Sequence, residues 1–160
     1  MKTIRIALLI GAVIATTLLV RAEASEEAKK DLAKLQGEWT MVAAAADGQP
    51  MPEEMRTAMR RFCTNDEVTV TLNGQIFIKA KITLDPSKTP KTIDYQMTEG
   101  LTKGEKQLGI YEFEGDTVKF CFSKPGENRP TELKPGFGRT FSTWKKVKET
   151  SESTEKKNSK

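Results

Sequence analysis

Apolar and polar residues alternate along most of the chain that follows Trp39. The clearest run is Gln75–Leu84, whose even-numbered aliphatic residues share one face while Lys79, Lys81 and Thr83 lie opposite. A period of two residues is the pattern of a half-buried β-strand. Further strands are predicted from Trp39 onward and at Arg61–Thr64, Glu67–Leu72, Thr92–Met97, Gln107–Glu114, Thr117–Ser123 and Arg139–Lys148.

Short turns join most of these strands. Asn73-Gly74 is the strongest hairpin signal, because both residues tolerate a positive φ. One connection, Lys124–Gly138, is about fifteen residues long, and loops of that length often act as lids or binding loops. The alanine run Ala43–Ala46 weakens the strand prediction after Trp39, since alanine has a low strand propensity.

Two segments have the composition of short helices. Ser25–Leu35 begins with a capping residue and two glutamates, carries lysines later, and is followed by Gly37. Pro52–Arg60 has proline in its first turn and two methionines four residues apart on one face.

About eight strands in sequence, with no helices alternating between them, exclude a parallel α/β architecture. An antiparallel meander that closes on itself leaves no free sheet edge. The sequence therefore predicts an all-β, eight-stranded antiparallel up-and-down barrel, with short helices before strand 1 and between strands 1 and 2. A two-sheet sandwich is the alternative.

If the barrel closes, one parity of each strand faces inward. A barrel of eight strands is either filled by side chains or holds one small ligand. The residues assigned to the interior are Trp39, Met41, Val68, Val70, Ile76, Ile78, Ile82, Ile93, Tyr95, Tyr111, Phe113, Val118, Phe120, Phe122 and Phe141.

The ends of the chain differ from the middle. Residues 1–24 begin with two basic residues, continue with the apolar run Ile6–Val20 and end in Ala22-Glu23-Ala24, which is the pattern of a cleaved signal peptide. Residues 149–160 contain no apolar side chain, so we expect a disordered tail. The predicted domain is residues 25–148, exported to the periplasm or the extracellular space, with an uncleaved anchor helix as the alternative for the first segment.

Charge adds little to this description. Removing residues 1–24 takes away three of the 26 basic and one of the 22 acidic residues, which leaves a net charge of +2. A nucleic-acid-binding surface needs basic residues clustered on one side, so this mixed composition argues against nucleic acid. We expect a monomer that does not stay inserted in a membrane once the signal segment is cleaved.

The chain contains no histidine and two cysteines. The absence of histidine excludes His-dependent nucleophilic catalysis and His-ligated haem or zinc. Cys63 and Cys121 fall on the second and seventh strands, which are not neighbours in a closed barrel, so we expect free thiols, with an interior pair as the alternative. The paired carboxylates are explained as surface charges. We therefore predict no catalytic residues, no metal, no cofactor and no enzymatic activity.

Gly37-Glu38-Trp39 matches the Gly-x-Trp signature of lipocalins. Further resembling segments are Leu35–Trp39, Asp47–Pro50, Leu84–Asp94, Gly109–Tyr111, Gly115–Thr117, Cys121-Phe122 and Arg129–Thr131. Together they are similar to a lipocalin-like domain family of unknown function that is abundant in planctomycete bacteria. The resemblance spans about Asp31 to Lys146 and implies an often exported β-barrel without an established ligand, so no functional residue is carried over.

In lipocalins a basic residue near the last strand lies over the first-strand tryptophan. The resemblance implies Arg139, Lys145 or Lys146 for that position, and a structural role at the barrel floor for Gly37 and Trp39.

The candidate ligand-binding residues are Tyr95, Tyr111, Phe120 and Arg129. A buried tyrosine hydroxyl needs a partner, which a ligand could supply, although a backbone carbonyl or the barrel rim would serve as well. Arg129 lies in the long loop and could meet an anionic group or pair with a nearby acid.

Two functions remain open. The first is an exported barrel that binds a small, largely apolar ligand, and the second is a filled barrel whose loops bind a protein partner or the cell envelope. An internal cavity of roughly 300 Å³ or more, open at one end, would favour the first.

Overall fold

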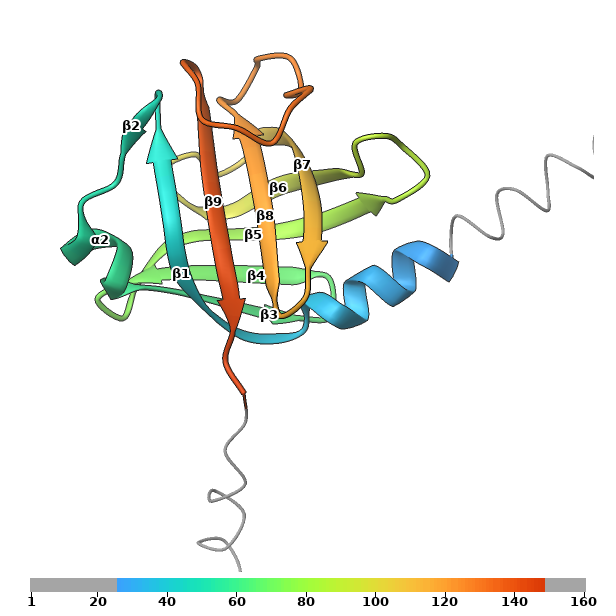
Figure 1. Cartoon of the computed structure of the whole chain (residues 1–160), viewed down its shortest axis with the longest axis horizontal. Coiled ribbons are helices and arrows are strands. Elements are labelled where there is room, and N and C mark those ends of the chain that lie inside the picture. Colours follow the sequence, from blue (N-terminus) through green and yellow to red (C-terminus); the bar gives the residue numbers. More distant parts are fainter. Residues whose placement is uncertain (1–25, 149–160) are drawn as a thin grey trace, which may run out of the picture.

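The computed structural model describes residues 26–148 (Figure 1). The predicted signal peptide at residues 1–24 and the predicted disordered tail at residues 149–160 lie outside the described residues. An N-terminal helix occupies residues 26–35. The other elements are β1 (Gly37–Ala46), β2 (Gln49–Pro50), α2 (Glu53–Ala58), β3 (Met59–Thr64), β4 (Glu67–Leu72), β5 (Gln75–Asp85), β6 (Thr92–Gly100), β7 (Lys106–Glu114), β8 (Thr117–Ser123) and β9 (Arg139–Lys146).

The strands form one closed antiparallel sheet. Its order is β1-β3-β4-β5-β6-β7-β8-β9, and β9 pairs with β1 over most of its length, while β2 adds only two residues to the end of β1. In Figure 1 the front strands β1, β8 and β9 cross the rear strands β4 and β5 at a large angle, as in a tightly closed barrel. The β1–β9 pairing confirms the eight-stranded barrel and excludes the two-sheet sandwich. The two short helices also occur where they were predicted.

The predicted hairpin turn at Asn73-Gly74 is present between β4 and β5. Asn73 has a φ of 53° and Gly74 a φ of 79°, the combination expected of a two-residue hairpin loop. The alanine run Ala43–Ala46 is extended, because its backbone pairs with β9 from Thr143 to Thr140. Pairing with a neighbouring strand here overrides low intrinsic propensity.

Most residues assigned to the interior are buried, but two assignments are wrong. Ile76 is 49% exposed, because β5 contains a bulge. Val70 of β4 pairs with Ile78 of β5, and the next residue, Thr71, pairs with Ile76. Phe77, between Ile78 and Ile76, therefore has no partner on β4. An extra residue of this kind reverses the parity of the strand beyond it. Phe77, not Ile76, therefore turns toward the barrel interior.

Phe141 is the second wrong assignment. In β9 the inward positions are Ser142 and Trp144, both buried, and Phe141 pairs with Cys121 on the opposite face of the sheet. Two further assigned residues, Ile78 and Phe113, are partly buried and pack against the core.

Both cysteines are free, as expected, and both are buried. Cys63 belongs to β3 and Cys121 to β8, which are separated by β1 and β9 around the barrel. Burial raises the pKa of each thiol, so both are held in the protonated, unreactive form.

We therefore expect two titratable thiols per chain when the protein is unfolded without reductant, and far slower reaction in the native state. Timed labelling with a thiol reagent, with and without denaturant, measures both. Finding no thiol in the unfolded protein would contradict a strand order that keeps β3 and β8 apart.

A second prediction concerns Gly109, an inward position of β7 whose missing side chain leaves room for the Phe122 ring. A Cβ at Gly109 would overlap that ring and lie 3.0 Å from the Cys121 carbonyl oxygen. Gly109→Ala should lower the free energy of unfolding by about 1–3 kcal/mol, measured by urea denaturation. Gly136→Ala is the matched control, because its nearest neighbour is the flexible end of Arg139 at 3.2 Å, and we expect a change below about 0.5 kcal/mol.

Candidate functional site

The N-terminal helix lies at one end of the barrel (Figure 1), and its residues Asp31 and Leu35 are buried there. Trp39 is 2% exposed, and its indole N–H donates a hydrogen bond of 2.8 Å to the carbonyl of Leu35, the last residue of that helix. Lys146 Nζ lies 5.4 Å from the centre of the Trp39 ring and donates to the Lys34 carbonyl at 3.0 Å. Of the three basic residues considered for this position, Lys146 therefore occupies it.

Gly37 makes the connection between this helix and β1 possible. Its φ of 94° is a conformation that residues with a Cβ rarely adopt, and it lets the chain reverse from the helix into the strand. Gly37 and Trp39 thus both lie at the end of the barrel where this helix joins β1.

Tyr111 also belongs to the floor and does not reach the interior cavity. Its hydroxyl donates to Asp31 Oδ2 at 2.8 Å, and the same carboxylate accepts from Lys91 at 2.8 Å and from Lys34 at 3.1 Å. Burial alone would raise the pKa of Asp31, but these hydrogen bonds outweigh it and the pKa is lowered. Burial and the adjacent carboxylate raise the pKa of Tyr111, so the phenol keeps its proton.

Arg129 lies outside the barrel, where it connects the long loop after β8 to strands β6 and β7. Its guanidinium donates to the carbonyl of Gly109 at 2.6 Å and lies 2.6 Å from Asp94 Oδ1. Pairing with an acid was one of the two roles considered for Arg129, and the partner is Asp94 on β6.

A cavity of about 120 Å³ occupies the interior above the floor. The side chains around it are largely apolar, and two of the sequence-predicted residues, Tyr95 and Phe120, line it. The full lining is Met41, Met51, Met59, Arg61, Val70, Phe77, Ile78, Tyr95, Gln107, Phe120, Phe122, Thr140, Ser142 and Trp144. Phe77 is 40% exposed, so the cavity meets solvent on that side, away from the floor.

The cavity contains one charged side chain, Arg61, which was not among the sequence-predicted site residues. Arg61 on β3 is 1% exposed; it donates from Nη1 to the Tyr95 hydroxyl at 2.5 Å, and its Cζ lies 4.6 Å from the centre of the Phe120 ring. Burial raises the pKa of Tyr95 although the nearby guanidinium opposes this, so the hydroxyl stays protonated. The alternation of β3 could have identified Arg61 from the sequence, because it lies two residues from both Met59 and Cys63, which face inward.

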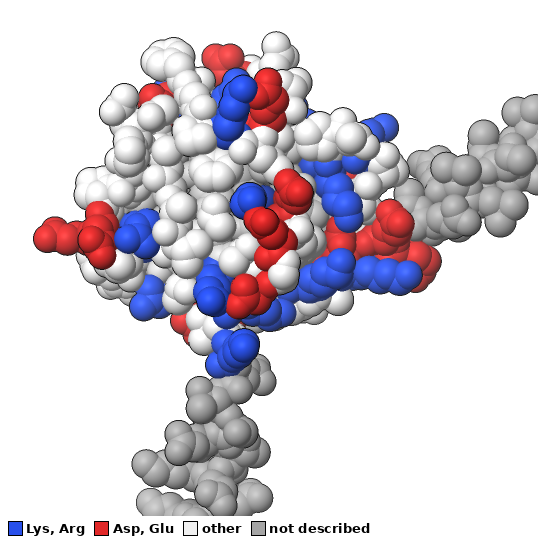
Figure 2. Space-filling model, in the orientation of Figure 1, with Lys and Arg blue, Asp and Glu red and all other residues white. Residues whose placement is uncertain are grey.

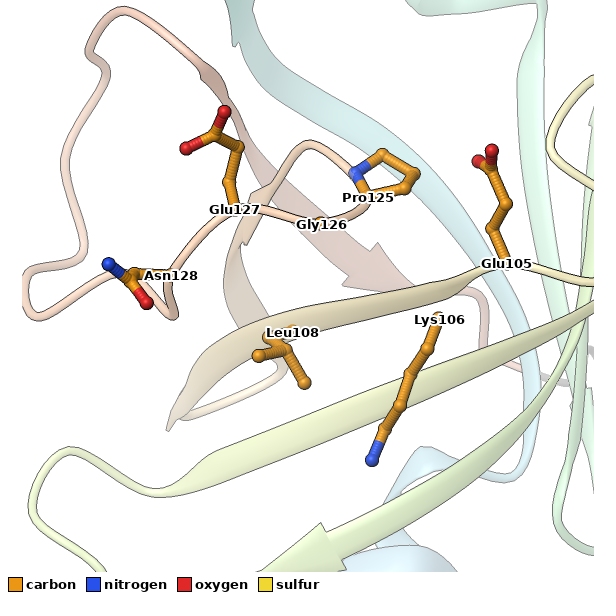
Figure 3. Close-up of a pocket in the computed structure, with 7 residues that line it drawn as sticks. All are labelled: Glu105, Lys106, Leu108, Pro125, Gly126, Glu127 and Asn128. Atoms are coloured by element: carbon orange, nitrogen blue, oxygen red, sulfur yellow. The ribbon is translucent and has the colours of Figure 1, made fainter.

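A larger hollow of about 530 Å³ lies on the outer surface, between the start of β7 and the loop after β8. The seven residues that line it are drawn in Figure 3, where their side chains point in different directions and do not converge on one point. Lys106, one of the seven, is already paired with Asp94 at 2.9 Å. The arrangement has no set of aligned polar groups that would orient a ligand.

Charged residues of both signs are mixed on the face seen in Figure 2. Among residues 26–148 there is no group of three or more His, Cys, Asp or Glu side chains placed to hold a metal ion. Over the same residues, no helix is long and apolar enough to cross a membrane.

Comparison with known proteins adds no relative, since no family model, curated protein or solved structure matches the chain.

The Asp31 cluster leads to a prediction about pH. Because the pKa of Asp31 is lower in the folded protein than its ordinary value of 3.8, its contribution to stability is present above about pH 4 and lost as the pH falls further. Asp31→Asn should lower the free energy of unfolding by about 2 kcal/mol at pH 7, the size of hydrogen bonds to a charged group.

Urea denaturation between pH 3 and pH 7 measures this difference, which should shrink as the pH falls below 4. Glu26→Gln is the control on the same helix, since Glu26 is exposed and pairs only with exposed Lys29. An equal loss of stability for Asp31→Asn at pH 3 and pH 7 would contradict the assignment.

Proposed function

We propose that this chain is an exported, lipocalin-like binding protein that takes up a small, largely apolar molecule inside its barrel. The observation that carries the proposal is the cavity with Tyr95 and Phe120 in its wall, closed below by Trp39 and reaching solvent beside Phe77. Apolar, concave, largely preformed sites of this kind are typical of small-molecule binding. Export and membership of the lipocalin-like family are part of the same proposal and rest on the sequence patterns.

The cavity limits the size of the ligand. Its volume of about 120 Å³ is below the roughly 300 Å³ that would suit a drug-sized molecule. A cavity of about 150 Å³ is enough to take up benzene. The enclosed part of the ligand should therefore contain at most about six non-hydrogen atoms, and any longer molecule would extend past Phe77 and Met51 toward solvent.

The alternative is a filled barrel that binds a protein partner through its loops. The small cavity favours this alternative, as do two exposed apolar side chains, Leu101 (95% exposed) and Phe137 (88% exposed), each in a loop. The two residues belong to different loops, Leu101 between β6 and β7 and Phe137 between β8 and β9, which is why the interior site is preferred.

The two functions can be separated by blocking the interior. Val70→Phe places a ring in the cavity, whereas Thr69→Phe adds the same ring to the preceding position of β4, which points away from it. Overpacking costs about 1–3 kcal/mol, so thermal melting is recorded first to establish that both variants fold.

We expect hexan-1-ol or benzene to shift the amide NMR signals of residues lining the cavity in the wild type and in Thr69→Phe, and not in Val70→Phe. Native mass spectrometry of protein purified from its own host should show a small-molecule adduct that Val70→Phe lacks. A wild-type protein that is bare in the mass spectrum and unaffected by either probe would overturn the proposal.

A further inference from the structure

Arg61 reaches across the barrel from one wall to the other. On β3 its neighbours across the ladder are Trp39 and Val70, both inward-facing, and its guanidinium contacts Tyr95 on β6 and Phe120 on β8. β6 and β8 are each three strands away from β3 around the barrel. The charged end therefore lies within the lumen, at the wall of the cavity.

Only part of this guanidinium is used by the protein. Within residues 26–148, Nη1 has the Tyr95 hydroxyl as its partner, whereas Nε and Nη2 are buried and have no acceptor. No carboxylate of the same residues lies within ion-pair distance of Arg61.

A buried positive charge without a counter-charge is costly, and arginine does not escape the cost by losing its proton. The faces of Phe120 and Tyr95 compensate part of it, because a guanidinium over an aromatic ring is attracted to the ring electrons. The unused donors nevertheless match the two oxygens of a planar anion.

We propose that Arg61 anchors the acidic group of the ligand, and that the ligand is a small aliphatic or aromatic monocarboxylate. This rests on the proposed interior binding site and specifies its chemistry. The carboxylate would accept from Arg61 Nε and Nη2, while Tyr95 holds Nη1 and the apolar body lies among Phe122, Met59 and the other apolar walls. One guanidinium balances one negative charge, so a doubly charged phosphate monoester would be left with an excess charge in an apolar cavity.

A purely structural role for Arg61 predicts something different. If the side chain serves only to fill the barrel, replacing it by methionine should not change which ligands enter. If it is an anion anchor, Arg61→Met removes an unpaired buried charge, so the ligand-free protein should melt at the same temperature or higher. Carboxylate binding should be lost at the same time.

The experiment compares hexanoate with hexan-1-ol, two probes with the same carbon chain, by calorimetric titration of the full chain. The wild type should bind hexanoate at least ten-fold more tightly than hexan-1-ol. Arg61→Met should weaken hexanoate about ten- to hundred-fold, the range of hydrogen bonds to a charged group, and leave hexan-1-ol binding unchanged or improved.

Two conservative variants keep the test decisive if Arg61→Met fails to fold. Arg61→Lys keeps the charge but loses the planar fork, and should bind hexanoate with intermediate affinity. Tyr95→Phe removes the acceptor that holds Arg61 Nη1 in place, and should weaken hexanoate several-fold without changing hexan-1-ol.

Each remaining outcome would contradict one specific part of the proposal. Equal binding of hexanoate and hexan-1-ol by the wild type would overturn the role of Arg61 and leave the interior binding site in place. Tighter binding of hexyl phosphate than of hexanoate would overturn the carboxylate class. Failure of both six-carbon probes to bind would overturn the interior site itself.

Discussion

The hydrogen bond from the Trp39 indole to the Leu35 carbonyl seals one end of the barrel, and the interior depends on that seal. It joins the N-terminal helix to the first strand, and the Asp31 carboxylate adds a second attachment through Tyr111 and Lys91. At the far side of the lumen, the lining residue Phe77 is 40% exposed. Arg61 lies in this lumen with 1% of its surface exposed, so its charge is placed in a largely apolar surrounding.

The barrel could be predicted from the sequence because its signals are local. Alternation along Gln75–Leu84 and the Asn73-Gly74 turn each involve neighbouring residues, and their succession without helices leaves few architectures. The wrong interior assignments arose where the side that a residue faces depends on how its strand pairs with another strand. The bulge at Phe77 is an irregularity in the pairing of β5 with β4, and alternation within β5 alone does not reveal it.

The candidate site was harder to predict because its contacts join residues far apart in the chain. A buried tyrosine was correctly expected to need a partner, but for Tyr111 that partner is Asp31, on a helix at the opposite end of the sequence. Arg129 likewise finds Asp94 on another strand. Arg61 follows Arg60, which is only half-buried, and the local signal that separates the two is that Arg61 is in phase with Met59 and Cys63.

Arg61 is also an energetically costly residue to place inside the barrel. An apolar side chain of similar length would fill the lumen at no electrostatic cost, and a buried charge often stabilises a fold less than such a replacement. Folding alone therefore gives little reason for a guanidinium whose Nε and Nη2 lack acceptors among the described residues. A ligand that supplies the missing acceptors offsets that cost on binding. The unfavourable burial of Arg61 in the ligand-free barrel then contributes to affinity and selectivity for an anion.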